Sequence, residues 1–261
     1  MRRVWGAVAG IAVAVLAGAS AAQAEVTIGD GYYGGMNTYN GQDVIGDTNV
    51  FDIKDATFER INAGNTLRVT IRTNYAGAPG SAAALGTGYG AFFITPGANA
   101  WTPTGTAPYA NDVYQAGDWA YAFTVPFNPG ASTSGSGSLY AISDGTVVMS
   151  NVGGNPVTYP NPGNGGYYFR QGQAVQFTPN GNASAVAGGS WSVQPGKLVF
   201  DINDNQFLGN SFAFSWAMTC GNDVIQGQVA GIPEPSTWAL LILGFGGCGV
   251  AVRRRRSLAH A

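Results

Sequence analysis

Histidine and cysteine are nearly absent from the sequence. The single histidine, His260, is the penultimate of 261 residues, and the two cysteines are Cys220 and Cys248. A catalytic serine or cysteine needs a base beside it, most often a histidine, so Ser–His and Cys–His pairs are excluded from the central part of the chain. A Cys/His metal cluster and an internal disulfide are excluded there as well. Cys220 follows an alternating apolar run, which favours a buried small residue over a reactive thiol.

Charged residues are also scarce, at 10% of the chain, and their distribution is uneven. Residues 25–231, called the body below, carry six basic and thirteen acidic side chains, for a net charge of about −7, and the other arginines lie near the two ends. The length of the body suits one domain with a sizeable core. Because nucleic-acid phosphates are bound by patches of Lys and Arg, this acidic body argues against nucleic acid as a partner.

The N-terminus has the three parts of a secretory signal peptide. Two arginines follow Met1, an apolar run covers 4–18, and the small residues Ala22 and Ala24 precede the expected cut. We therefore expect signal peptidase to remove residues 1–24. An uncleaved N-terminal anchor is the alternative, but the apolar run is short of the roughly 20 residues that a membrane span needs.

The C-terminus combines a proline-flanked turn, a short apolar segment and a run of arginines. Pro233-Glu234-Pro235 ends any regular element, and the fifteen residues 238–252, led by Trp238, are apolar or small. As a helix they would measure about 22 Å, less than the roughly 30 Å hydrocarbon core of a bilayer. The arginines 253–256 stay cytoplasmic by the positive-inside rule. We expect 232–261 to insert as a short transmembrane helix with a basic cytoplasmic end; the alternative is a simple tail anchor without processing.

These C-terminal features resemble the PEP-CTERM sorting signal of exported proteins in Gram-negative bacteria that make exopolysaccharide. The resemblance implies that exosortase, a membrane-embedded enzyme, recognises the tail and cuts near the proline triplet. It further implies a transient stay in the inner membrane, then a place at the cell surface, in the outer membrane or in the extracellular matrix, in association with exopolysaccharide. The sorting residues under this resemblance are Pro233, Glu234, Pro235, Trp238, Arg253, Arg254, Arg255 and Arg256.

The body also resembles the ectodomains that commonly precede such tails. The segments that carry this second resemblance include 43–46, 67–75 and 216–223. It spans most of the body and implies no particular activity.

Alternation of apolar and polar residues dominates the body, and no stretch shows convincing helical periodicity. Residues 66–73 alternate strictly, as half-buried antiparallel strands do. We therefore predict an all-β fold, a two-sheet β-sandwich of jelly-roll type over 25–231, with a β-helix as the alternative. Asp144-Gly145 predicts a hairpin that joins the strands on either side of it. The expected strands are 57–61, 66–73, 89–94, 119–125, 139–142, 146–149, 167–177, 197–202 and 211–218.

No cofactor motif occurs in the sequence, and calcium is the one ion that it suggests. Oxygen-bearing side chains alternate at Asp201, Asn203 and Asn205, as they do in calcium loops. The segment is not an EF-hand, because Gln206 replaces the glycine and Phe212 the final glutamate. The alternative is that these residues hydrogen-bond the backbone in turns. A second acidic group consists of Asp43, Asp47, Asp52 and Asp55.

Aromatic residues are frequent in the segments expected to form loops. Trp101 lies in a stretch rich in Pro, Thr and Gly, where an exposed ring would stack on a sugar. The alternative is that such rings cover the ends of the sandwich.

Three functions remain open for the body. The absence of a catalytic constellation favours a non-enzymatic cell-surface or extracellular-matrix protein. A carbohydrate-binding module, with or without calcium, is the alternative. A glycan-active hydrolase is the third, although glycoside hydrolysis needs two carboxylates at a fixed separation and the only glutamates of the body, Glu25 and Glu59, share no motif.

Overall fold

The structure is a computed structural model in which the compact unit Glu25–Pro233 contains the body. The predicted signal peptide and the apolar segment 238–252 with its arginines lie outside the described residues, except for Ala24 and 245–246. Within the described ranges, no helix combines the length and the apolar composition needed to cross a membrane. These ranges are 24–35, 42–77, 87–125, 133–150, 170–233 and 245–246.

The body is built from strands, which confirms the all-β prediction. Among the described residues of the compact unit Glu25–Pro233, the only helical elements are one short α-helix, α1 (Thr48–Phe51), and two turns of 3₁₀-helix, η2 (Asn62–Gly64) and η3 (Ile142–Asp144). The strands are β1 (Glu25–Gly29), β2 (Ile53–Ile61), β3 (Thr66–Thr73), β4 (Phe92–Pro96), β5 (Tyr121–Thr124), β6 (Ser134–Ala141), β7 (Gly145–Met149), β8 (Ala174–Pro179), β9 (Ala187–Gln194), β10 (Lys197–Ile202), β11 (Phe212–Ala217) and β12 (Val224–Val229).

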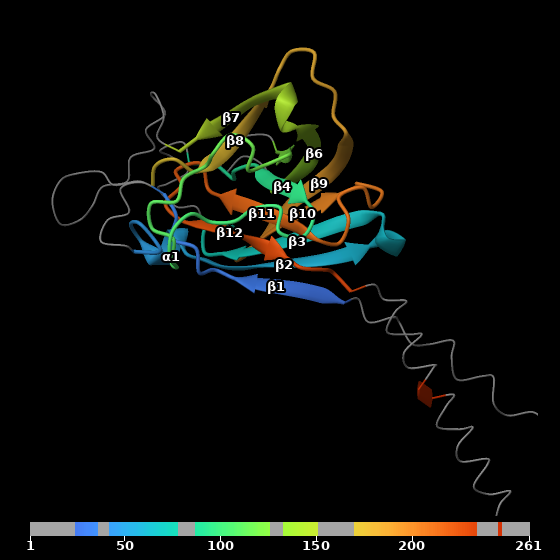
Figure 1. Ribbon diagram of the computed structural model, residues 1–261, viewed down its shortest axis with the longest axis horizontal. Helices are drawn as coiled ribbons and strands as arrows, with labels where there is room; N and C mark the ends of the chain where they lie inside the picture. The colour runs from blue at the N-terminus through green and yellow to red at the C-terminus, as the bar shows by residue number, and fades with distance from the viewer. Residues whose placement is uncertain are drawn as a thin grey trace, which may run out of the picture. The chain divides into compact units, whose positions relative to one another are not determined.

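Ten strands form one continuous antiparallel sheet, in the order β1-β2-β3-β10-β9-β6-β5-β4-β11-β12, while β7 and β8 form a separate pair (Figure 1). The large sheet curls until its end strands β1 and β12 touch, so it is nearly closed. The two layers expected of a sandwich are therefore the two halves of this sheet. The neighbours β3 and β10, β4 and β11, and β6 and β9 come from distant parts of the chain, as is common in jelly rolls.

Aromatic side chains fill the space between the two halves of the sheet. Phe58 of β2 packs against Phe92 of β4 and against Phe212 and Phe214 of β11, with ring centroids 4.6 to 6.3 Å apart. All four rings are fully buried. Burying one such side chain contributes about 1.5–3 kcal/mol, so this cluster strongly favours the arrangement in which the halves face each other.

Two strands, β3 and β10, have the predicted bounds. Every residue of β10 pairs with β3. The aliphatic residues of β3 are buried, whereas Arg68 faces outward and donates to both carboxylate oxygens of Asp201 on β10, at 2.7 and 2.8 Å. Apolar burial on one face and ion pairing on the other thus fix the same register.

A second hydrophobic cluster lies on the outer face of β4, β5 and β11, beneath β8 and the segment 97–119. β11 alternates large inner side chains with small outer ones such as Ala213 and Ala217. β8 can therefore approach closely, and the N–H of Ala91 donates to the carbonyl of Val175 at 2.9 Å. A Cβ atom at Gly90 would lie 2.0 Å from the Ala217 carbonyl oxygen, so only glycine fits there.

The hairpin predicted at Asp144-Gly145 is wrong. β6 pairs with β5 and β9, and β7 pairs with β8. Between them η3 turns the chain out of the large sheet. The rule that Asp-Gly joins paired strands fails because the large sheet already satisfies both edges of β6.

Candidate functional site

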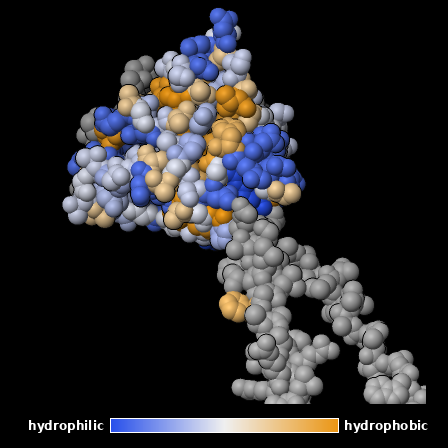
Figure 2. All heavy atoms as spheres, turned by 45° about the vertical axis from the view of Figure 1, so that its right-hand side comes forward, coloured by the Kyte–Doolittle hydropathy of each residue, from blue (hydrophilic) through white to orange (hydrophobic). Residues whose placement is uncertain are grey.

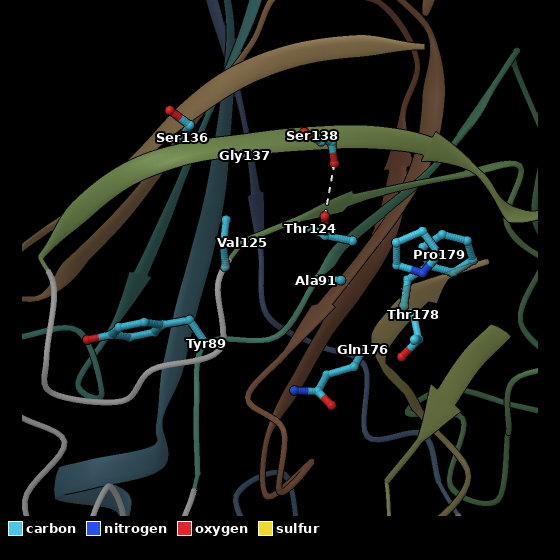
Figure 3. Close-up of a pocket in the computed structure, with 11 residues that line it drawn as sticks. Tyr89, Ala91, Thr124, Val125, Ser136, Gly137, Ser138, Gln176, Thr178 and Pro179 are labelled. Atoms are coloured by element: carbon cyan, nitrogen blue, oxygen red, sulfur yellow. Dashed lines mark hydrogen bonds between the residues drawn. The ribbon is translucent and has the colours of Figure 1, made fainter. Parts of the chain in front are cut away.

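An open groove of about 460 Å³ lies between β8 and the strands β5 and β6 of the large sheet. We call it the β6–β8 groove. Figure 3 shows β6 along one side and the β8 side chains along the other. The residues that line it are Tyr89, Ala91, Thr124, Val125, Ser136, Gly137, Ser138, Gln176, Phe177, Thr178 and Pro179.

The lining of the β6–β8 groove is polar but uncharged. It contains five hydroxyl side chains, the phenol of Tyr89 among them, and one amide, and no Asp, Glu, Lys or Arg. Thr124 Oγ1 donates to the Ser138 carbonyl oxygen at 3.2 Å. The phenol oxygen of Tyr89 accepts from the Gly77 N–H at 3.4 Å, and burial raises the pKa of Tyr89, so the phenol stays neutral at physiological pH. The groove can therefore offer hydrogen bonds but no ion pair.

The Ser/Gly alternation of β6 creates one wall of this groove. Ser136 and Ser138 point outward, whereas Gly137 and Leu139 on the opposite face are buried. A Cβ atom at Gly137 would lie 2.3 Å from the ring of Phe123, so glycine lets this ring pack beneath the strand. The same repeat gives the outer face a row of hydroxyl groups. The sequence alone did not reveal this wall, because β6 lacks alternating apolar residues at its start.

A second hollow of about 390 Å³, the aromatic hollow, contains Trp101. Trp101 is only 7% exposed, because its ring stacks on Trp119 at 6.0 Å and meets the edge of Tyr32 at 5.6 Å. The expectation of a freely exposed Trp101 ring is therefore not met. The amide of Gln228 is engaged, since it donates to the Trp101 carbonyl and accepts from the Asn99 N–H. The lining is Gly29, Gly31, Tyr32, Asn99, Trp101, Thr102, Pro103, Tyr109, Gln226, Gly227 and Gln228.

Three carboxylates that are distant in sequence meet beside a buried arginine. Asp30, Asp43 and Asp223 place oxygen atoms within 4.8 Å of one another. Arg170 is fully buried and donates to the backbone carbonyls of Gly34, at 2.5 Å, and of Asp43. Asp223 accepts from two backbone N–H groups, at 2.6 and 2.8 Å. We call Asp30, Asp43, Asp223 and Arg170 the acidic centre.

Three carboxyl groups and one guanidinium group make up the acidic centre. Burial, followed by repulsion from neighbouring carboxylates, raises the pKa of Asp30 and of Asp223 well above the usual value. Burial raises the pKa of Asp43 to about 6, against the attraction of Arg170. Burial lowers the pKa of Arg170. Carboxylate oxygens at this spacing are the ligands that calcium prefers, so these are the described residues with the chemistry to hold such an ion.

Two of the three residues predicted to bind calcium, Asp201 and Asn203, are hydrogen-bonded to other side chains. Asp201 is engaged by Arg68, and Asn203 Oδ1 accepts from the Thr66 hydroxyl at 3.0 Å. Asn205 adopts a left-handed turn conformation with φ of 47°. Of the second predicted acidic group, only Asp43 reaches the acidic centre; Asp47 caps α1, Asp52 pairs with Lys54, and Asp55 pairs with Arg72.

Cys220 is buried, as expected from its position after an alternating run. Burial raises the pKa of the Cys220 thiol to about 11, so the thiol is protonated at neutral pH. A protonated, enclosed thiol is a poor nucleophile.

The last core residue of the compact unit Glu25–Pro233 directly precedes the proline triplet. Ile232 is 3% exposed, and its N–H donates to the Asn210 carbonyl at 2.9 Å. Two residues earlier, the Ala230 carbonyl accepts from the Ser211 hydroxyl at 2.6 Å. Pro233 is the next residue, and Glu234, Pro235, Trp238 and the four arginines lie outside the described residues.

A family model for the PEP-CTERM protein-sorting motif matches residues 231–256, the segment that begins at this boundary. The chain carries a PEP-CTERM sorting motif. The motif implies an exported, membrane-transiting protein that is sorted by exosortase, and it confirms the resemblance of the tail. No curated protein and no solved structure matches the chain. The motif therefore accounts for delivery, and the role of the body rests on its own geometry.

Proposed function

We propose that this PEP-CTERM protein is a non-enzymatic component of the cell surface or extracellular matrix that associates with exopolysaccharide. The observation that carries the proposal is the β6–β8 groove, which is open, rich in hydroxyl and amide groups, and free of charge. The sorting motif supports the proposal, because it implies export of the protein, and exopolysaccharide is an exported polymer.

The placement of the carboxylates supports a binding role over hydrolysis. A glycosidase needs a carboxylic acid and a second carboxylate on either side of the scissile bond. Neither the β6–β8 groove nor the aromatic hollow has a carboxylate in its lining. The acidic centre has three, but Asp223 is fully buried and both its oxygens accept backbone N–H groups. A bound sugar in either hollow would therefore meet no acid–base pair.

The position of Ile232 supports release of an intact body. Because Ile232 completes the core and Pro233 follows it, a cut at the proline triplet would remove no strand. In this proposal signal peptidase removes residues 1–24 and the tail holds the body at the inner membrane. Exosortase then releases it to the cell surface, the outer membrane or the matrix.

Fractionation combined with mass spectrometry tests the proposed function. The full chain is expressed in a host with exosortase and exopolysaccharide, and in a matched strain that makes no exopolysaccharide. We expect the mature protein to begin at Glu25, to lack the arginine cluster, and to sediment with the matrix only where exopolysaccharide is made. Full-length protein in the cytoplasm, or equal release from both strains, would contradict the proposal.

A second candidate function is a carbohydrate-binding module supported by a divalent cation. The acidic centre favours it, because three carboxylates face one guanidinium. If a cation completes the charge balance, calcium should raise the midpoint of thermal unfolding and a chelator should lower it. Elemental analysis of the purified chain provides the independent check; no bound metal and no calcium-dependent shift would remove this candidate. Incubation with polysaccharides and an assay for new reducing ends tests the hydrolase alternative.

A further inference from the structure

We infer that the β6–β8 groove binds a strand of neutral glycan. The inference rests on the proposed association with exopolysaccharide, and it names the binding site and the class of sugar. The groups that would contact the sugar are the hydroxyls of Ser136, Ser138 and Thr178 and the amide of Gln176. They lie on two strands, β6 and β8, that face each other across the groove (Figure 3).

The polar groups of the groove are available to a ligand. Within the described ranges, the side chains of Ser136, Ser138, Gln176 and Thr178 have no hydrogen-bond partner, and none is among the buried polar atoms that lack one. They therefore reach the open space of the groove. Hydroxyl and amide groups both donate and accept, which matches the sugar hydroxyl, itself a donor and an acceptor.

Apolar surfaces accompany these polar groups. Tyr89, Phe177 and Pro179 also line the groove, and in the view of Figure 3 Tyr89 and Pro179 lie toward opposite ends of it. Rings of this kind can pack on the C–H face of a sugar. The volume of about 460 Å³ lies within the range of roughly 300–1,000 Å³ that is usual for ligand sites. Packing on the flanks and hydrogen bonds from the walls together suit a polar, ring-shaped ligand.

Charge distinguishes neutral from acidic glycans at this site. The lining has no Lys or Arg to pair with a uronate carboxylate. The body carries about seven negative charges in excess, which repels a polyanion at low ionic strength. The mixed surface in Figure 2 shows hydrophobic residues scattered among hydrophilic ones over the displayed face of the body. An uncharged glycan can bind in this groove without leaving a charged group of its own buried and unpaired.

The other hollow is less suited to this role. In the aromatic hollow the amide of Gln228 already has partners on both sides, and Trp101 is almost covered. Gln226 lies on the same hollow, and its side-chain amide makes no hydrogen bond with another described residue. Substitution of Gln226 therefore provides a matched control, an amide lost from a different depression of the same domain.

Affinity electrophoresis of the full chain in mild detergent tests the inference. The gels contain a soluble β-glucan, a galactomannan, polygalacturonate, or the exopolysaccharide of the native host. We expect retardation by at least one neutral polymer. We expect Gln176→Ala with Thr178→Val to weaken this binding by about tenfold or more, because each hydrogen bond contributes roughly a factor of five. Gln226→Ala should bind as the unaltered chain does.

A second variant tests the same groove from its other wall, without changing Gln176 or Thr178. Ser136→Trp introduces a bulky ring from an exposed position of β6 and should abolish retardation. Thermal unfolding midpoints close to that of the unaltered chain show that each variant is folded.

Each remaining outcome decides against a defined claim. Retardation by polygalacturonate alone, or by native polymer that is wholly acidic, would overturn the neutral-glycan inference and leave the proposed function standing. Binding that survives both groove variants, or that is lost equally in Gln226→Ala, would place the site elsewhere and overturn the inference. No retardation by any polymer, the native exopolysaccharide included, would refute both the inference and the proposed function.

Discussion

The β6–β8 groove and the acidic centre are both polar regions of one domain, yet they differ in charge and access. The groove is open and its lining has no charged residue, while the centre has three carboxylates around an enclosed guanidinium. Four groove side chains have no hydrogen-bond partner within the described residues, those of Ser136, Ser138, Gln176 and Thr178. Arg170 and Asp223, in contrast, hold backbone groups of distant segments together. The polar residues of the centre position loops, whereas we propose that those of the groove contact a ligand.

The largest expected effect is the loss of stability when Arg170 of the acidic centre is replaced, compared with replacement of an arginine in a surface ion pair. Arg170→Met removes the buried cation and leaves three carboxylates without it, so the free energy of unfolding at pH 7 should fall by about 3–5 kcal/mol. Arg68→Met is the control, because Arg68 is partly exposed and pairs with Asp201 on the surface; it should cost about 1 kcal/mol or less. Urea titration of the full chain measures both. Equal losses would show that the centre is no more important than the surface pair.

A smaller loss of stability should follow a substitution that displaces β8 and so disrupts the β6–β8 groove. A Cβ atom at Gly90 would meet carbonyl oxygens of Ala217 and Val175, at 2.0 and 2.7 Å. Gly90→Ala should therefore push β8 from the sheet, lower stability by about 1–3 kcal/mol, and weaken glycan binding. Gly181→Ala is the control, since a Cβ atom there meets nothing within 4 Å. Unchanged binding by Gly90→Ala would mean that the seating of β8 does not shape the site.

Asp43 of the acidic centre should contribute to the pH dependence of stability. The pKa of Asp43 is raised to about 6, so the folded state holds this proton more tightly than the unfolded state. The corresponding stability is present below about pH 4 and is lost as the pH rises through about 6. Because the carboxyl of Asp43 is partly exposed, solvent screening limits this loss of stability to about 1 kcal/mol. Asp43→Asn should remove the loss, since the amide does not titrate.

Unfolding midpoints measured from pH 4 to pH 7 check the sign. The unaltered chain should lose stability relative to Asp43→Asn over this interval. The unfolding midpoint of Ser136→Ala, a variant in the groove, should change with pH as that of the unaltered chain does. Parallel curves for all three proteins would show that Asp43 does not control the pH response.

The smallest effect on stability is expected from the groove substitutions that remove binding. The side chains of Gln176 and Thr178 have no partner within the described residues, so Gln176→Ala with Thr178→Val should change the free energy of unfolding by less than about 0.5 kcal/mol. Chemical denaturation provides the measurement. A loss of several kcal/mol would assign these residues to the structure of β8 instead of to ligand contact.

The sequence predicted a strand correctly where apolar and polar residues alternate along its whole length. β3 and β10 alternate strictly and have the predicted bounds. The sequence did not reveal β9, because Gly188 and Gly189 interrupt its apolar pattern. It also did not reveal β1 and β12, the strands at the two ends of the sheet. The continuity of the sheet depends on the pairing of β6 with β9, which no local pattern encodes.

The polar sites could not be predicted, because they assemble from distant segments. Asp30, Asp43 and Asp223 meet only after β1 and β12 have come together. The spacing of Asp201, Asn203 and Asn205 does not show that the neighbouring strand places Arg68 opposite Asp201. The sorting motif is the contrasting case: it is linear, so its residues could be read directly from the sequence.

Hydrogen–deuterium exchange in the presence of a neutral oligosaccharide tests the central claim most directly, because exchange reports local protection segment by segment. The full chain is labelled with and without the sugar that retards it most strongly. The account predicts slower exchange in Ser134–Ala141 and Ala174–Pro179, the strands that wall the groove, and unchanged exchange around Asp30 and Asp223. Protection confined to the aromatic hollow or the acidic centre, with β6 and β8 unchanged, would contradict it.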